Sequence, residues 1–381
     1  MRKGIINTIV FLVLIIGVAQ HVYAEDIAKP KIGLALSGGG AKGFAHIGAI
    51  KALEELKIPI DYIGGTSIGS IVGGMYAIGY SPESIMQIVE QQDWDYAISD
   101  KMIRDHMPFF EKEEMDRYVI SLPITKRNIE FPSYFVKGQN IMQLLTDYTI
   151  RYHSVSNFSQ FPIPFLCVAT DLVSGEEIVM KEGFLPECMR ASMAIPAAVS
   201  AEEVNGRLLV DGGVSNVFPV DRVREMGADL VIGIDIQSGL HTKEELNDGR
   251  NLIPQLVAII SKERYEENVK NCDYHIQPEI SGFSISSFTV TAARELYNRG
   301  YDAVMNNKAE FIRLRDSLNL LPLPIEKYKP IGNDDVFFVR KIVVKESNTE
   351  LSNYVKGKLE IQEGAFVPFY LITEGIQKLY A

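Results

Sequence analysis

Short apolar runs alternate with longer segments of helical periodicity between residues 30 and 318. The apolar runs are mostly continuous, as expected of strands that are covered on both faces of a sheet. They predict strands at residues 31–36, 60–65, 164–172, 207–213, 229–236 and 273–278. Helical periodicity is clearest at residues 81–91, where Ser81 and Pro82 predict the helix start, and at residues 139–152 and 290–318. This alternation predicts a layered α/β domain around a mainly parallel sheet.

The first 24 residues have a pattern that does not belong to a folded domain. Arg2 and Lys3 precede an uncharged apolar run, and small residues end the segment at Ala24. This arrangement is typical of a secretory signal peptide, with an uncleaved membrane anchor as the alternative. Both interpretations predict export from the cytoplasm, and we expect residues 1–24 to be a signal peptide.

Two further segments depart from the alternating pattern. Residues 95–137 are rich in charged and aromatic side chains, and we interpret them as an insertion over one end of the sheet, with a strand at NIEFPSYFV. A lid or membrane-facing element and an ordinary surface insertion are both open for it. Residues 319–334 are rich in proline and predict a linker. Residues 335–381 then predict a half-buried strand at VFFVRKIVVK and two short helices, ELSNYVKGKLE and FVPFYLITEGIQKLY.

Composition narrows the class of protein. Of 381 residues, 46% are hydrophobic and 23% are charged, which is typical of a globular chain. The formal net charge of −11 argues against a nucleic-acid partner, which requires a basic face. The cysteines Cys167, Cys188 and Cys272 are odd in number and fit no zinc spacing. The sequence therefore predicts neither a disulfide framework nor a metal site.

The glycine-rich turn SGGGAKG follows the first predicted strand and precedes a helical pattern, a setting in which backbone N–H groups hold negative charge. Gly38, Gly40 and Gly43 match the dinucleotide spacing G-x-G-x-x-G. A dinucleotide site also needs an acidic residue at the end of the second strand, but Asp61 lies at its start. A phosphate-binding P-loop fails as well, because Lys42 is followed by glycine. The remaining candidate for the negative charge is an oxyanion that forms during a reaction.

A G-x-S-x-G motif stands at the end of the second strand. It consists of Gly65, Thr66, Ser67, Ile68 and Gly69, and an apolar helix follows it. Strand, tight turn and helix form the context of a nucleophile elbow, which predicts Ser67 as a nucleophile. Two parallel neighbouring strands end at one edge of a sheet, so the N–H groups of the glycine turn can face Ser67 and hold a tetrahedral oxyanion.

A serine nucleophile needs a general base. Asp211 follows a predicted strand and precedes Gly212 and Gly213, and its alternative is a turn residue in an ordinary hairpin. The α/β-hydrolase order of serine, aspartate and histidine would end at His241. His46 lies one turn beyond the glycines and can equally be a packed helix residue.

Taken together, these segments resemble the patatin-like phospholipases. The segments are GLALSGGGAKGFAHIGAIKALEE, GGTSIGS, ATDLVSGE, RASMAIPA and LLVDGGVSNVFPVD, in this order within residues 30–315. The resemblance implies a three-layer α/β fold, Ser67 as nucleophile, Asp211 as general base, no catalytic histidine and no cofactor. It also implies an oxyanion hole built from Gly38, Gly39, Gly40, Ala41, Lys42 and Gly43. The family often has arginine at the position of Lys42, which keeps the charge.

The C-terminal segment, residues 335–381, is similar to the first part of a POTRA domain, a small α+β module found beside outer-membrane barrels. A full module has two further strands after its second helix, which this stretch does not include. The resemblance implies a location in the periplasm or at the outer membrane and a barrel or assembly partner. We expect a patatin-like domain at residues 30–318 with a partial POTRA-like segment behind the linker.

These resemblances imply an exported lipid acyl hydrolase, of phospholipase A or lysophospholipase type, that works on lipid esters at a membrane surface. Two alternatives are open. One is a patatin fold of weak or no activity that serves outer-membrane assembly, and the other is a thioesterase or acyltransferase with the same Ser-Asp pair.

Overall fold

The structure is a computed structural model that describes residues 29–99, 124–125, 128–129, 134–247, 251–318, 335–344 and 349–380. The expected signal peptide and linker, and most of the interpreted insertion at residues 95–137, lie outside the described residues. Among the described residues, no helix combines the length and the apolar character that crossing a membrane requires.

An eight-stranded sheet forms the centre of the molecule, in the order β12-β11-β1-β2-β6-β10-β9, with β7 paired to β6. Strands β12, β11, β1, β2 and β6 are parallel, whereas β10 runs antiparallel to β6 and β9. The sequence prediction of a mainly parallel sheet is confirmed. The strands are β1 (Ile32–Leu36), β2 (Tyr62–Thr66), β6 (Phe165–Asp171), β7 (Glu177–Met180), β9 (Glu202–Val204), β10 (Arg207–Asp211), β11 (Leu230–Ile234) and β12 (Tyr274–Ile276).

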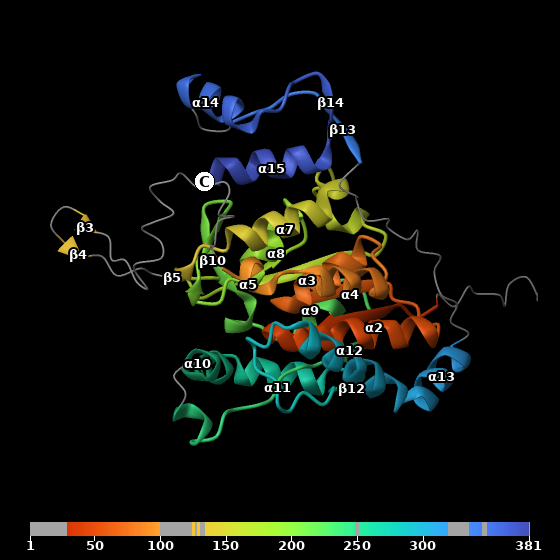
Figure 1. Ribbon diagram of the computed structural model, residues 1–381. Helices are drawn as coiled ribbons and strands as arrows, with labels where there is room; N and C mark the ends of the chain where they lie inside the picture. Colours follow the sequence, from red (N-terminus) through yellow and green to blue (C-terminus); the bar gives the residue numbers. More distant parts are fainter. Residues whose placement is uncertain are drawn as a thin grey trace, which may run out of the picture.

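Helices cover both faces of this sheet (Figure 1). The large core cluster joins Leu34 and Leu36 of β1 to α2, α3 and α12, and a smaller cluster joins Ala35 to α9. Alternate side chains of one strand therefore pack into cores on opposite faces of the sheet, which explains the continuous apolar runs. The helices of this domain are α2 (Phe44–Glu55), α3 (Ile68–Ala77), α4 (Pro82–Gln91), α5 (Trp94–Ala97), α7 (Gln139–Thr149), α8 (Leu185–Ser192), α9 (Val220–Glu225), α10 (Leu252–Ile260), α11 (Lys262–Lys270), α12 (Val290–Met305) and α13 (Lys308–Ser317).

Helix boundaries follow local chemistry. The Ser81 side chain accepts a hydrogen bond from the Ser84 N–H and Pro82 opens α4, as the sequence predicts. The helical pattern predicted at residues 290–318 forms two helices, α12 and α13, which are separated at Asn306 and Asn307. Asparagine competes for backbone hydrogen bonds, and the Asn307 side chain bonds the Ala303 carbonyl there.

Short elements complete the domain. Single turns of 3-10 helix lie at η1 (Gly40–Gly43), η3 (Ile150–Tyr152), η4 (Phe158–Gln160), η5 (Gly212–Val214) and η6 (Glu245–Asn247). The predicted strand NIEFPSYFV contains two pieces, β4 and β5. In two small sheets, β5 pairs parallel with β8 and β3 pairs antiparallel with β4; their bounds are β3 (Ile124–Thr125), β4 (Asn128–Ile129), β5 (Tyr134–Val136) and β8 (Ala197–Val199).

The C-terminal unit contains β13 (Val336–Val339), α14 (Thr349–Leu359), β14 (Ala365–Pro368) and α15 (Phe369–Tyr380). In Figure 1 it lies at the opposite end of the molecule from α10 and α11. The second predicted helix is wrong in its first part, because residues 365–368 form a strand that pairs antiparallel with β13. Gly364, at a positive φ of 75°, turns the chain, and its N–H bonds the Val339 carbonyl.

Candidate active site

Two turns meet at one edge of the sheet. Strands β1 and β2 are parallel neighbours with Leu36 opposite Gly65, so the glycine turn after β1 adjoins the turn that carries Ser67. A Cβ added to Gly38 would stand 3.3 Å from the Ser67 Cβ. The structure therefore places the glycine turn against the serine.

Ser67 occupies a strained backbone conformation between β2 and α3, with φ 55° and ψ −125°. Such a conformation costs about 1–3 kcal/mol and occurs at functional sites. The flanking glycines permit it, because a Cβ on Gly65 would stand 2.3 Å from the Gly69 carbonyl oxygen, and one on Gly69 2.4 Å from that of Leu36. The Ser67 N–H donates to Ser192 Oγ at 2.9 Å, which fixes the turn from the other side.

Asp211 ends β10 and reaches the serine directly. Ser67 Oγ donates to Asp211 Oδ2 at 2.7 Å, and the Gly213 N–H donates to Oδ1 at 2.7 Å. The close packing needs Gly212, where a Cβ would stand 2.2 Å from the Val168 carbonyl oxygen. Ser67 and Asp211 are only 6% and 7% exposed. Burial raises the pKa of Asp211 to about 6, against the opposing hydrogen bonds from Ser67 and Gly213.

The two histidines considered from the sequence lie elsewhere. His46 is fully buried in α2 with Nε2 2.9 Å from the Ser37 carbonyl oxygen, and burial lowers its pKa to about 4. His241 Nδ1 lies 3.7 Å from a Glu245 carboxylate oxygen. Within the described chain, the Asp211 carboxylate is bonded by Ser67 and Gly213 and by no imidazole. Ser67, Asp211 and His241 therefore do not form a catalytic triad in this structure.

The glycine turn offers fewer free donors than its glycine count suggests. The Gly38 N–H donates to the Val217 carbonyl at 2.9 Å, and the Ala41 N–H donates to that of Ile285 at 2.9 Å. Gly39 and Gly40 have φ values of 152° and 59°, which favour glycine. Within the described residues, their N–H groups have no partner outside their own turn. Gly39 and Gly40 are therefore the donors left for an oxyanion.

The other two residues of the predicted oxyanion hole have different surroundings. Lys42 is buried with Nζ 3.4 Å from Ser238 Oγ, and burial lowers its pKa to about 8. A Cβ on Gly39 would lie 3.5 Å from Lys42 Cε, so the ammonium group stands close behind the turn. Gly43 allows close packing, because a Cβ there would stand 2.3 Å from a side-chain carbon of Ile68. Lys42 therefore places a positive charge near the glycine turn, and Gly43 leaves room for the side chain of Ile68.

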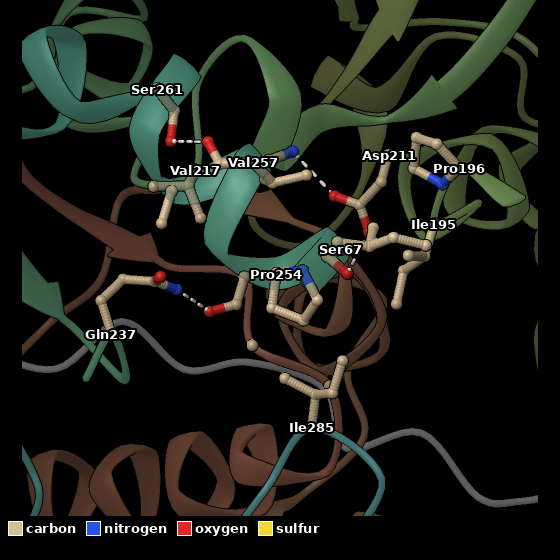
Figure 2. A pocket seen from close by; sticks show the side chains of 16 residues that line it. Ser67, Ile195, Pro196, Asp211, Val217, Gln237, Pro254, Val257, Ser261 and Ile285 are labelled. Carbon is tan, nitrogen blue, oxygen red and sulfur yellow. Dashed lines mark hydrogen bonds between the residues drawn. The ribbon is translucent and has the colours of Figure 1, made fainter. Parts of the chain in front are cut away.

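A pocket of about 590 Å³, including the open space at its mouth, contains Ser67 and Asp211 (Figure 2). The glycine turn and Gln237 form part of its wall, and α10 forms another part. Its apolar lining residues are Ile195, Pro196, Val217, Ile253, Pro254, Val257, Ala258 and Ile285. The sequence interpretation missed α10; the signal for it is the uncharged run LIPQLVAII.

The cysteines are the other residues that the sequence raised as candidates for a chemical role. Cys167 and Cys188 are buried, and all three cysteines are free thiols. Among the described residues, no group of three or more histidine, cysteine, aspartate or glutamate side chains is placed to hold a metal ion.

Comparison with known proteins finds a family model, patatin-like phospholipase, that matches residues 34–224. An uncharacterised NTE family protein of Mycobacterium tuberculosis is 30% identical over 231 residues, which cover 61% of this chain and 54% of the relative. Lysophospholipase NTE1 of Kluyveromyces lactis is 31% identical over 215 residues, 56% of this chain and 13% of that one. The chain thus spans about half the length of the mycobacterial relative. Among solved structures, VipD from Legionella pneumophila aligns with a TM-score of 0.41 at 16% identity, covering 78% of this chain and 72% of VipD.

Proposed function

The chain belongs to the patatin-like phospholipase family, and on this premise we propose that it hydrolyses the fatty-acyl esters of phospholipids or lysophospholipids with Ser67 as nucleophile and Asp211 as general base. The observation that carries the proposal is the 2.7 Å hydrogen bond from Ser67 Oγ to Asp211 inside an apolar pocket. Beside it lie the N–H groups of Gly39 and Gly40, which have no partner outside their own turn among the described residues. A mainly apolar lining of this kind favours an acyl chain over a polar group.

The proposed reaction has two halves. In the first, Asp211 takes the proton of the Ser67 hydroxyl while Oγ forms a bond to the ester carbon. The N–H groups of Gly39 and Gly40 hold the carbonyl oxygen as it becomes negative. The carbon then releases the alcohol, which takes the proton from Asp211, and Ser67 keeps the acyl group. In the second half, Asp211 deprotonates a water molecule whose oxygen forms a bond to the acyl carbon. The bond from that carbon to Ser67 Oγ then breaks, Oγ takes the proton back from Asp211, and the fatty acid leaves.

The environment of Asp211 suits it to act as a base without a histidine. A general base works best when its pKa lies near the working pH, and burial raises that of Asp211 to about 6. The carboxylate is therefore mostly ionised at pH 7 and still more basic than an exposed aspartate. Gly213 holds Oδ1 through its N–H, which leaves Oδ2 for the proton of Ser67.

The exposed apolar face of α10 favours a lipid surface as the partner at the pocket mouth. Its inner face, with Ile253 and Val257, lines the pocket. Its outer face carries four side chains that are between 51% and 66% exposed: Leu252, Leu256, Ile259 and Ile260. The nine residues of α10 contain no charge, so apolar surface continues from the pocket to the outside. Exposed apolar patches mark surfaces that contact membranes or other apolar partners, and we propose contact with the acyl boundary of a membrane for α10.

The double variant Leu256→Gln with Ile260→Gln tests that role of α10. We expect weaker sedimentation with phosphatidylcholine vesicles and slower hydrolysis of vesicle substrate, with unchanged hydrolysis of a soluble short-chain ester. Leu351→Gln is the matched control, because Leu351 is 50% exposed but lies on α14. Equal vesicle binding by the double variant and the wild type would remove α10 as the membrane contact.

We propose the cellular location of the protein and the partner of its C-terminal segment from the sequence pattern alone. Residues 1–24 are proposed to direct export, and the POTRA-like segment behind the linker is proposed to contact an outer-membrane barrel or assembly protein. Fractionation of a bacterial host that expresses the full chain, with N-terminal sequencing of the product, tests the first proposal. A cytoplasmic product that keeps residues 1–24 would contradict it.

The central experiment for the enzymatic proposal is labelling with a fluorophosphonate, followed by mass-spectrometric mapping of the modified residue. We expect one labelled site, Ser67, and we expect Ser67→Ala to lose both the label and ester hydrolysis. Ser159→Ala is a matched control at an exposed serine and keeps both. Absence of label from an intact, folded wild type would instead favour the non-catalytic assembly module.

A further inference from the structure

The side chain of Gln237 is hydrogen-bonded to the glycine turn. Its side-chain Nε2 donates to the Gly38 carbonyl oxygen at 2.5 Å. Gly38 is the residue whose peptide bond leads to Gly39, one of the two free donors of the glycine turn. Figure 2 shows Gln237 across the pocket from Asp211, with its hydrogen bond drawn as a dashed line. The amide of Gln237 therefore holds the side of the turn that does not face the carboxylate.

The geometry of one peptide unit links that contact to the oxyanion. The described chain has no cis peptide bond, and in a planar trans peptide the C=O and N–H groups point in opposite directions. Whatever fixes the direction of the Gly38 carbonyl therefore fixes the direction of the Gly39 N–H. A glycine on each side of this peptide removes the steric barrier that keeps other peptides in place. The peptide can rotate unless a hydrogen bond restrains it.

Other hydrogen bonds hold the chain before this peptide, which leaves the peptide between Gly38 and Gly39 as the variable part. The Gly38 N–H is bonded to Val217, and the Ile236 N–H donates to Ser37 Oγ at 2.9 Å. These bonds hold the chain as far as Gly38. The Ser37 hydroxyl lies 3.3 Å from the Gly38 carbonyl oxygen and adds a second, longer contact. Gln237 provides the shorter of these two contacts.

Gln237 is itself held by a buried anchor. Its backbone N–H donates to Asp235 Oδ1 at 2.9 Å, and Asp235 is only 1% exposed. The other oxygen of Asp235 accepts from Tyr265, His275 and Gln277. The amide thus projects from a fixed point at the end of β11.

We infer that Gln237 is a positioning residue that aims the Gly39 N–H at the oxyanion by restraining the Gly38 carbonyl. The inference rests on the proposed ester hydrolysis and names a further residue for it. Gln237 makes no bond to Ser67 or Asp211 within the described residues, so it acts through the turn. The restraint costs nothing at the moment of reaction, because it is already formed in the free protein.

Gln237→Met tests the inference, because methionine keeps the length of the side chain and removes the donor. Loss of a direct oxyanion donor lowers kcat by roughly 100- to 1,000-fold, and a loosened donor costs less. We expect kcat for a soluble ester to fall about tenfold while KM changes less than about twofold. The affinity for an acyl trifluoromethyl ketone, which forms the tetrahedral adduct, should fall by the same factor as kcat.

Gln92→Met is the matched control, because the Gln92 amide also donates to a backbone carbonyl, that of Ile88 at 3.3 Å, but does not line the pocket. We expect this variant to keep wild-type kcat and inhibitor affinity. Unchanged kcat in Gln237→Met, or an equal loss in both variants, would overturn the inference. An inactive wild type would instead contradict the proposed function, so the two failures are distinguishable. The melting temperature separates either outcome from misfolding.

Discussion

Asp211→Asn is expected to change activity and stability in opposite directions. The substitution keeps the shape of the side chain, so its oxygen can still accept from the Gly213 N–H and its amide can face Ser67. It removes the proposed general base, and the contribution of such a group is typically 100- to 10,000-fold in rate. We therefore expect hydrolysis of a soluble ester to fall by roughly that factor, measured as kcat/KM at pH 8.

The stability gain follows from the pKa of Asp211. Burial raises this pKa from 3.8 to about 6, so the folded protein carries an ionised group that would be more stable in water. About two pKa units correspond to about 3 kcal/mol, at ~1.4 kcal/mol per unit. This cost is absent below pH 3.8, grows as the pH rises from 3.8 to about 6, and is complete above pH 6. Asparagine carries no such cost at any pH.

Urea unfolding at two pH values measures the effect. At pH 8 we expect Asp211→Asn to raise the free energy of unfolding by up to about 3 kcal/mol, and at pH 4 we expect little difference from the wild type. Asp171→Asn is a useful comparison, because hydrogen bonds from its own turn, the Val173 N–H first, lower the pKa of Asp171. A variant of Asp211 that is inactive and less stable at pH 8 would refute the assignment of a buried, costly carboxylate.

Three further results are expected. The wild-type kcat/KM should rise with pH and reach half its maximum near pH 6, because Asp211 acts as a base only when ionised; a flat profile from pH 5 to 8 would contradict this. Activity should fall again above about pH 8, because the buried Lys42 behind the glycine turn loses its charge there. Lys42→Arg should move this fall to higher pH. If the variant lost activity at the same alkaline pH as the wild type, Lys42 would be excluded as the cause. His241→Ala should keep wild-type kcat in the same assay, whereas a loss as large as that of Ser67→Ala, at equal melting temperature, would restore a histidine to the mechanism.

The sequence was most informative where one local rule determines the structure. Continuous apolar runs predicted strands with a core on each face, and Ile32 and Leu34 lie in one core while Val231 lies in the other. The two glycine motifs predicted tight turns after neighbouring strands, and the parallel pairing of β1 with β2 brings them together. Their short-range chemistry needs no knowledge of distant residues.

The features that the sequence did not predict depend on distant contacts. The Gly38 N–H is used by Val217, which lies 179 residues further along the chain, so counting glycines overstates the free donors. The strand β14 forms because β13 offers an edge to pair with, although helical periodicity continues through its residues. The position of α10 over the pocket likewise follows from tertiary packing, and periodicity gives only the helix.

The geometry around Asp211 favours the proposed mechanism, in which a Ser-Asp pair acts without a histidine. An aspartate near the serine is a weak base unless its surroundings disfavour the charged form. Here the carboxylate is enclosed at a sheet edge where only glycines fit, since a Cβ on Gly212 would contact the backbone of β6. The same enclosure that raises the pKa of Asp211 also packs the glycine turn against Ser67, where we propose that it holds the oxyanion. A substitution that opens this edge should therefore lower the basicity of Asp211 and the strength of the oxyanion contacts together, whereas Gln237→Met should weaken only the second.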